Sequence, residues 1–89
     1  MISVAFSSAF KRSLSKAIRK KPSRRAAFEA ALTLFIADPF ARSLKTHKLA
    51  GPLKDHWSFT VEYDLRVIFR FVESEKVVFE AIGSHDEVY

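Results

Sequence analysis

One stretch of the chain decides its fold, and it reads WSFTVEYDLRVIFRFV over residues 57–72. Apolar residues alternate with polar ones through Trp57–Tyr63, and a second alternation follows in Leu65–Phe71. Because successive side chains of a β-strand point to opposite faces, this period of two predicts two strands. Asp64 falls between them, at the end of the expected hairpin.

The strand pattern extends on both sides of this hairpin. Residues 73–75 (Glu-Ser-Glu) predict a turn, and residues 76–82 predict a third strand of an antiparallel meander. A weaker alternation over residues 2–6 predicts a short strand near the start of the chain.

Between these strands, the apolar spacing becomes that of two amphipathic helices. Their apolar stripes comprise Phe10, Leu14, Ala17 and Ile18, and then Phe28, Ala31, Leu32, Phe35 and Ile36. Lys21-Pro22-Ser23 separates the helices, because the residue before a proline avoids the α region, and Ser23 is expected to cap the second one. Asp38-Pro39 ends the second helix, so the pair predicts an antiparallel helical hairpin.

Residues 40–56 show no clean period and predict a connecting segment that Leu44, Leu49 and Leu53 anchor to the core. The resulting order is β-α-α-β-β-β, an α+β fold in which a helical hairpin packs on a small, mainly antiparallel sheet. A chain of 89 residues has no room for a second core, so residues 1–89 are expected to form a single domain.

Composition excludes several classes of protein. Hydrophobic residues make up 48% of the chain and include nine phenylalanines, which suffices for a packed interior. The absence of cysteine excludes disulfides, thiolate metal sites and cysteine nucleophiles. No apolar run approaches the roughly 18 residues of a membrane helix, and the start of the chain lacks the basic segment of a signal peptide. We therefore expect a cytoplasmic protein that makes no contact with a membrane.

Charge is distributed unevenly along the chain. Residues 1–56 hold 12 Lys and Arg residues against 3 Asp and Glu residues, whereas residues 57–89 hold 3 against 7. Eight of the basic residues lie between Lys11 and Arg25. Such a surface attracts polyanions, although a hydrated helix surface would carry the same pattern. The lack of acidic residues nearby favours contact with a nucleic acid or an acidic protein partner.

Arg66 is the first candidate for contact with a phosphate. It alternates away from the apolar residues of its strand, which places its guanidinium on the open face of the sheet. A guanidinium stays charged and its planar donors match phosphate oxygens, but pairing with Glu62 or Glu80 across the sheet would equally explain the position. Asp64 directly precedes the same strand and is expected beside it.

Two histidines and a tyrosine extend this set. His47 lies in the segment before the sheet, and His85 follows Gly83 at the end of the last strand, with Tyr89 close behind. Imidazole gains or loses a proton near neutral pH, so two in one cleft can act as base and acid. Each histidine alone is more often a surface or capping residue. His56 lacks a supporting context and is expected to face solvent.

Phosphodiester chemistry by these residues is expected to need no metal and no cofactor, since the chain shows neither metal-ligand spacing nor a glycine-rich phosphate loop. RNA permits such chemistry because its own 2′-hydroxyl can attack the adjacent phosphorus. The residues expected to contact RNA are Lys11, Arg12, Lys16, Arg19, Lys20, Lys45, Lys48, Lys54 and Trp57. Trp57 has two interpretations, stacking on an RNA base or burial with the apolar residues of its strand. Burial is favoured, because Trp57 alternates in step with those apolar residues.

Several of these motifs resemble the RelE/ParE toxin superfamily, most closely its YafQ and YoeB types. They are HKLAG (47–51), WS (57–58), DLRVIF (64–69) and GSHDEVY (83–89), and the predicted order of elements matches as well. Members are toxins of type II toxin–antitoxin systems, and the RelE, YoeB and YafQ types cut mRNA on the ribosome without a metal. The resemblance thus implies an endoribonuclease whose partners are mRNA, the ribosome with its rRNA, and an acidic antitoxin.

The resemblance also implies roles for individual residues. His47 takes the place of the general base, and His85 that of the general acid, although the two roles could be exchanged. Arg66 matches the arginine that stabilises the phosphate in the YoeB type. Asp64 matches an active-site aspartate of the YafQ type, and Tyr89 matches a terminal aromatic residue.

The chain departs from these relatives at two positions. Thr60 stands where the YafQ type has a second histidine, and Gly83 where the RelE and YoeB types have an arginine. Two other functions share the fold, namely inhibition of DNA gyrase by ParE-type toxins and antitoxin binding by a catalytically inactive relative. Because ParE-type toxins generally lack the histidine set, His47, Arg66 and His85 favour the nuclease.

Overall fold

The computed structural model describes residues 1–89, and its elements follow the predicted order with two additions, β2 and α3. The elements are β1 (Ser3–Phe6), α1 (Ser8–Lys20), α2 (Arg24–Ala37), β2 (His47–Lys48), β3 (Trp57–Glu62), β4 (Leu65–Glu73), β5 (Lys76–Gly83) and α3 (His85–Val88). Two 3₁₀ turns, Arg42–Leu44 and Gly51–Leu53, flank β2.

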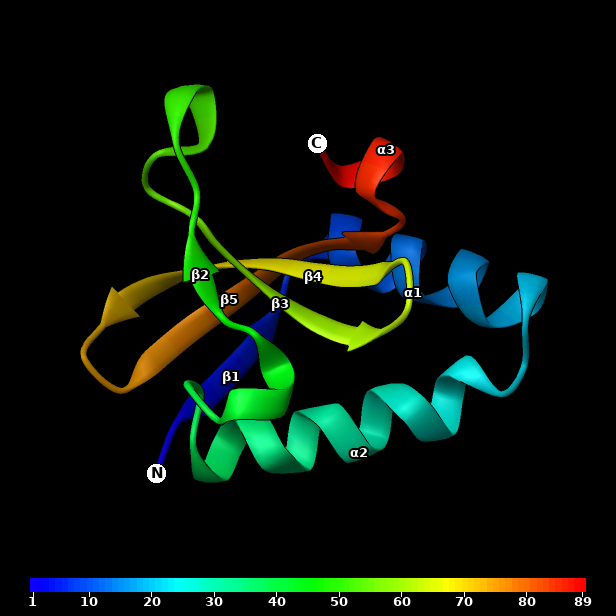
Figure 1. The fold of residues 1–89 in the computed structure, drawn as a ribbon, viewed down its shortest axis with the longest axis horizontal. Coiled ribbons are helices and arrows are strands. Elements are labelled where there is room, and N and C mark those ends of the chain that lie inside the picture. The colour runs from blue at the N-terminus through cyan, green and yellow to red at the C-terminus, as the bar shows by residue number, and fades with distance from the viewer.

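The strands form one five-stranded sheet in the order β1-β5-β4-β3-β2 (Figure 1). Strands β3, β4 and β5 run antiparallel in succession, which confirms the predicted meander, and β1 joins the edge of β5 in parallel. A parallel pair cannot be joined by a tight turn, and residues 7–75, which include both helices and β2 to β4, separate these two strands. The expected α+β fold with a mainly antiparallel sheet is thereby confirmed.

Both long helices contribute to one core on the same face of the sheet, and the chain reverses direction between them at Lys21–Ser23 (Figure 1). Ser7 begins α1 by accepting a hydrogen bond from the Phe10 N–H at 3.0 Å. Ser23 precedes α2 as predicted, but its backbone is already helical and its side chain caps nothing, so the predicted cap is wrong. Each helix packs on the sheet more than on the other helix. No helix is both long and apolar enough to span a membrane.

Phenylalanine dominates the core between the helices and the sheet. Five phenylalanine side chains have no exposed surface, namely Phe10, Phe35, Phe59, Phe69 and Phe79. The Phe79 ring lies 5.3 to 6.2 Å from the other four ring centroids, within the range where aromatic pairs add to simple burial. Because Phe59 and Phe69 are among them, the phase predicted for β3 and β4 is confirmed, and Arg66 is left for the opposite face.

The segment 40–56, predicted as a plain connection, contains the strand β2. His47 and Lys48 pair with Ser58 and Trp57 of β3, so the sheet has five strands where the sequence predicted four. Two residues are too few to show a period, and alternation therefore cannot reveal this strand. Leu44 anchors the segment as predicted, with 2% of its surface exposed.

Candidate active site

The open face of the sheet carries Arg66, the second residue of the central strand β4. Arg66 of β4 lies opposite Thr60 of β3 on one side and Gly83 of β5 on the other. Ser58 lies two residues before Thr60 in β3, on the same face of the sheet, and it pairs with His47 of β2. The strand register, which the apolar alternation sets, therefore brings His47 and Arg66 to one face.

A cleft of about 360 Å³ opens on this face and is lined by His47, Leu49, Arg66, His85 and Tyr89. Four of the five residues predicted as catalytic thus surround one volume, although they come from distant parts of the chain. Leu49, expected only as an anchor to the core, forms part of the wall. The structure gathers two imidazoles, a guanidinium and a phenol at this place.

Asp64 lies beside the cleft and holds two of its residues. Its Oδ1 accepts a hydrogen bond from the backbone N–H of His85 at 3.2 Å and lies 3.7 Å from Nη1 of Arg66. The chain turns from β3 into β4 here, and Asp64 adopts a φ of 55°, a left-handed conformation that aspartate tolerates better than most residues. Asp64 therefore ties the C-terminal segment to the arginine instead of lining the cleft.

A hydrogen bond determines the tautomer of His47. Its Nδ1 lies 3.0 Å from the carbonyl oxygen of Lys45. A carbonyl oxygen only accepts, so Nδ1 carries the proton and Nε2 of the neutral ring remains a proton acceptor. This state suits a general base.

His85, the first residue of α3, and Tyr89, which directly follows the helix, enter the cleft together. They lie four residues apart, a spacing that puts both side chains on the same side of a helix. Their ring centroids are 4.5 Å apart, and the rings meet edge to face at 64°. The short helix thus presents an imidazole and a phenol as one unit.

A capping box holds α3 in place. The Ser84 Oγ accepts a hydrogen bond from the Glu87 N–H at 3.3 Å, and the Glu87 Oε1 accepts one from the Ser84 N–H at 2.8 Å. The other carboxylate oxygen of Glu87 pairs with Nζ of Lys20 on α1 at 3.4 Å. The hydrogen bond from the Ser84 backbone, followed by the one from Lys20, lowers the pKa of Glu87 from 4.5 to about 2.

Gly83 leaves room for this box. A Cβ at this position would lie 3.0 Å from Oε1 and 3.1 Å from Cβ of Glu87. A side chain at this position would therefore press on Glu87, which would have to shift by a few tenths of an ångström. Glycine at position 83, where the RelE and YoeB types have an arginine, lets the capping box form without that shift.

Arg66 pairs with neither carboxylate considered as its alternative partner. Glu62 pairs with a lysine of the turn between α1 and α2 at 3.5 Å, and Glu80 with another arginine of β4 at 2.9 Å. The guanidinium of Arg66 contacts only Asp64, at 3.7 Å, and its side chain is 31% exposed. It is open to an anion in the cleft.

His56, expected to face solvent, belongs to a polar network outside the cleft. Its side chain is 25% exposed, and its Nε2 lies 3.9 Å from the Glu80 carboxylate, which also accepts a hydrogen bond from Arg70 Nε. The His56 carbonyl accepts a hydrogen bond from the Leu49 N–H at 3.0 Å, which fixes the residue against the start of the sheet. No group of three or more His, Asp or Glu side chains is placed to hold a metal ion.

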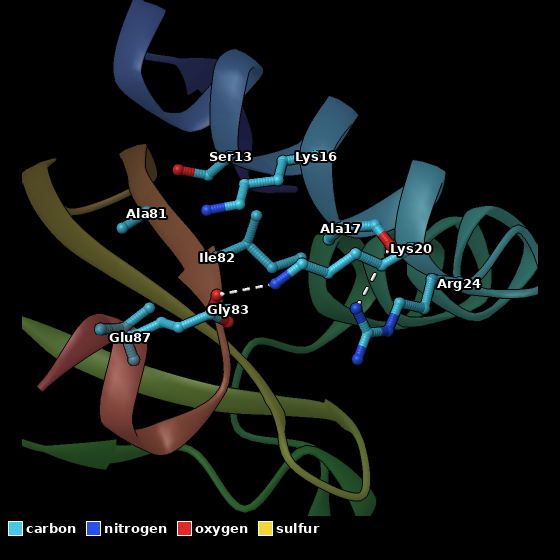
Figure 2. Close-up of a pocket in the computed structure, with 10 residues that line it drawn as sticks. Ser13, Lys16, Ala17, Lys20, Arg24, Ala81, Ile82, Gly83 and Glu87 are labelled. Atoms are coloured by element: carbon cyan, nitrogen blue, oxygen red, sulfur yellow. Dashed lines mark hydrogen bonds and ion pairs between the residues drawn. The ribbon is translucent and has the colours of Figure 1, made fainter.

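The basic residues of α1 form two further hollows. Lys11, Arg12 and Arg19 surround one of about 370 Å³, and Lys16 and Lys20 border another of about 290 Å³ between α1, β5 and α3 (Figure 2). Of these five residues, only Lys20 has an acidic partner. The helix thus carries cations that the protein itself does not neutralise.

Trp57 lies away from the cleft. Its ring meets Phe40 and Phe71 at centroid distances of 5.5 and 5.8 Å, beside the core. This position favours the packing alternative that its phase indicates, and its contact with RNA stays a prediction. The lysines predicted alongside it are exposed in the segment around β2, namely Lys45, Lys48 and Lys54.

Comparison with known families assigns the chain to one of them. The family profile described as "Bacterial toxin of type II toxin-antitoxin system, YafQ" matches residues 2–89. The chain belongs to this YafQ family. It is accordingly a toxin of the type II toxin–antitoxin class, and the resemblance seen in its motifs is confirmed. A comparison with curated protein sequences produced no match.

Solved structures of other toxins share the fold of this YafQ-family member. YafQ from E. coli superimposes with a TM-score of 0.81 at 21% identity, over 100% of this chain and 99% of that one. The E. coli DinJ–YafQ complex gives a TM-score of 0.79 at 21% identity, with coverage of 100% and 99%. A YoeB/ParE toxin from Agrobacterium tumefaciens gives 0.77 at 14% identity, with coverage of 94% and 99%.

Proposed function

We propose that this YafQ-family toxin is an endoribonuclease that cleaves mRNA on the ribosome through the 2′-hydroxyl of the RNA. The observation that carries the proposal is the cleft, where His47, Arg66, His85 and Tyr89 surround about 360 Å³. The reaction needs a base for the hydroxyl, a cation for the phosphorane and an acid for the leaving oxygen. The cleft holds a candidate for each.

In the proposed reaction, Nε2 of His47 takes the proton of the 2′-hydroxyl, whose oxygen attacks the adjacent phosphorus. Arg66 stabilises the negative charge that develops on the phosphorane oxygens. His85 gives a proton to the 5′-oxygen as the P–O5′ bond breaks, which leaves a 2′,3′-cyclic phosphate and a 5′-hydroxyl. The hydrogen bond from His47 to Lys45 supports this assignment of base and acid over the reverse.

The proposed partners follow from charge. The uncompensated cations of α1, among them Lys11, Arg12 and Arg19, suit the phosphates of rRNA. The same surface suits an acidic antitoxin, and the E. coli relative is described in a complex with DinJ. Because ribosomes lie in the cytoplasm, we expect the toxin to act there.

Loss of His85 or Arg66 should suppress cleavage. We expect His85→Ala and Arg66→Ala each to lower mRNA cleavage by at least about a hundredfold, the usual scale for a missing acid–base group. The measurement is primer extension on a translated reporter mRNA. Thermal unfolding should stay unchanged, because neither side chain belongs to the core.

A matched control is His56→Gln, which removes an imidazole outside the cleft and should leave cleavage intact. Full cleavage by His85→Ala and Arg66→Ala would overturn the proposal. A supercoiling assay in parallel distinguishes the other functions of the fold. Loss of gyrase activity without mRNA cuts would support a ParE-type inhibitor, and antitoxin binding with neither effect would support an inactive relative.

A further inference from the structure

We infer that Glu87 is a positioning residue, whose capping box with Ser84, assisted by Lys20, orients α3 so that His85 and Tyr89 point into the cleft. The inference rests on the proposed function, because it concerns the residue that donates the proton. Its structural basis is the set of contacts around α3, and these can be measured without any nuclease assay.

The helix α3 has no anchor in the core. It comprises His85–Val88, and none of these residues is buried. A helix of one turn is not stable alone, so contacts with the rest of the protein determine how it lies. The polar contacts available are the hydrogen bond from the His85 N–H to Asp64 and the bonds of Glu87.

The two sides of α3 line two different hollows. His85 and Tyr89 line the catalytic cleft, whereas Glu87, together with Gly83, lines the hollow beside α1 (Figure 2). Because the two sides belong to the same turn of helix, a rotation that moved Glu87 would also move the His85 ring. Glu87 therefore sets the direction of His85 from the far side of the helix.

The contacts of Glu87 are mutually consistent. Oε1 accepts the Ser84 N–H at 2.8 Å, while Oε2 faces the ammonium of Lys20, which reaches across the hollow in Figure 2. Gly83 allows the carboxylate to approach, since a Cβ there would lie 3.0 Å from Oε1. The pKa of about 2 leaves the carboxylate charged at neutral pH.

The negative charge of Glu87 makes the inference testable, because its removal should have opposite effects on RNA affinity and on the cleavage rate. A carboxylate among cations opposes the binding of a polyanion, so its removal should by electrostatics alone leave RNA affinity unchanged or strengthen it. A loss of cleavage on removing Glu87 without a loss of affinity would then have a positional cause.

The test compares Glu87→Ala with Asp86→Ala, which removes the neighbouring exposed carboxylate that makes no ion pair. We expect Glu87→Ala to lower the single-turnover cleavage rate about fivefold or more, the scale of a missing helix cap. The affinity for the mRNA–ribosome complex should stay constant or rise. Hydrogen exchange at the Ser84 and His85 amides should accelerate in Glu87→Ala and stay unchanged in Asp86→Ala.

Two further variants separate position from charge. Glu87→Gln should recover most of the rate, because glutamine also serves at this position of a capping box. Gly83→Ala should lower the rate although Glu87 is present, because the new Cβ pushes against the carboxylate.

Equal rates in Glu87→Ala and Asp86→Ala would overturn the inference, and so would a defect confined to affinity. Failure of Glu87→Gln to exceed Glu87→Ala would overturn the role of the capping box. If the wild-type protein cleaves no mRNA, the proposed function falls, and amide exchange in Glu87→Ala still decides whether Glu87 holds α3.

Discussion

Single residues of this toxin reach the cleft for different physical reasons. Arg66 faces the cleft because the apolar residues on either side of it in β4 point into the core, so its own side chain points to the opposite face. The sequence alone predicts this orientation. His47 depends on the two-residue strand β2 and on a hydrogen bond to Lys45. His85 depends on Asp64, which lies 21 positions earlier in the chain. The chemical type of each side chain made all of these residues candidates. Only for Arg66 did the alternation along the strand also predict which face of the sheet the side chain lies on.

Asp64 offers a test at the residue scale. Asp64→Ala should lower cleavage about tenfold, because the His85 N–H and the Arg66 guanidinium lose a charged acceptor. Asp64→Asn should keep most of the activity, since an amide oxygen still accepts and asparagine also tolerates a φ of 55°. Single-turnover cleavage measures both effects, and thermal unfolding monitors the fold.

The Asn variant decides between two roles for Asp64. If Asp64→Asn proved as inactive as Asp64→Ala, the carboxylate would need a direct part in the chemistry, and the positioning role would be wrong.

The elements that matter most for the cleft are the shortest ones, β2 and α3. Each is too short to show a period, and each is placed by its neighbours: β2 by pairing with β3, and α3 by Asp64 and the capping box. The longer strands and helices, by contrast, follow their apolar patterns and were predictable. The sequence therefore predicts the scaffold better than the elements that carry the histidines.

Glu87 gives α3 a predictable response to acid. Its pKa is about 2 in the folded protein against an ordinary 4.5, so its ionised form stabilises the fold. That contribution is complete above about pH 4.5 and is lost as the pH falls toward about 2. The difference in free energy of unfolding between wild type and Glu87→Gln should shrink over this interval in urea titrations at low salt.

Asp86→Asn is the control for general acid effects, because Asp86 lies in the same helix turn without an ion pair. A difference between wild type and Glu87→Gln that stayed constant down to about pH 2 would contradict the lowered pKa.

In the whole molecule, catalysis and polyanion attraction are assigned to different surfaces. The cations of α1 line hollows that share no residue with the cleft. The helix buries its apolar stripe against the sheet, which turns its basic side outward. Under the proposed function, the basic surface of α1 would bind a large anion while the separate cleft acts on one phosphodiester.

This separation predicts independent effects on binding and rate. Replacing Lys11, Arg12 and Arg19 by alanine should weaken ribosome binding. The slope of log K against log salt concentration should become shallower by about 0.7 to 0.9 for each phosphate that the protein no longer neutralises. The cleavage rate at saturating ribosome should persist, because none of the three lines the cleft. Binding titrations at several salt concentrations provide the measurement, and unchanged salt dependence would argue against an RNA-binding role for this surface.

By itself, the sequence determined the layers of this protein, the phase of β3 and β4, the side of the sheet on which Arg66 lies, and the residue types of the site. Apolar periodicity carries that information because burial is the main driving force of folding and repeats with the geometry of each element. Only the tertiary structure decided which groups meet: Asp64 at the His85 amide, Glu87 at Lys20, and Trp57 against Phe40 and Phe71 beside the core. These contacts depend on distance and direction between residues far apart in the chain, which no local pattern encodes.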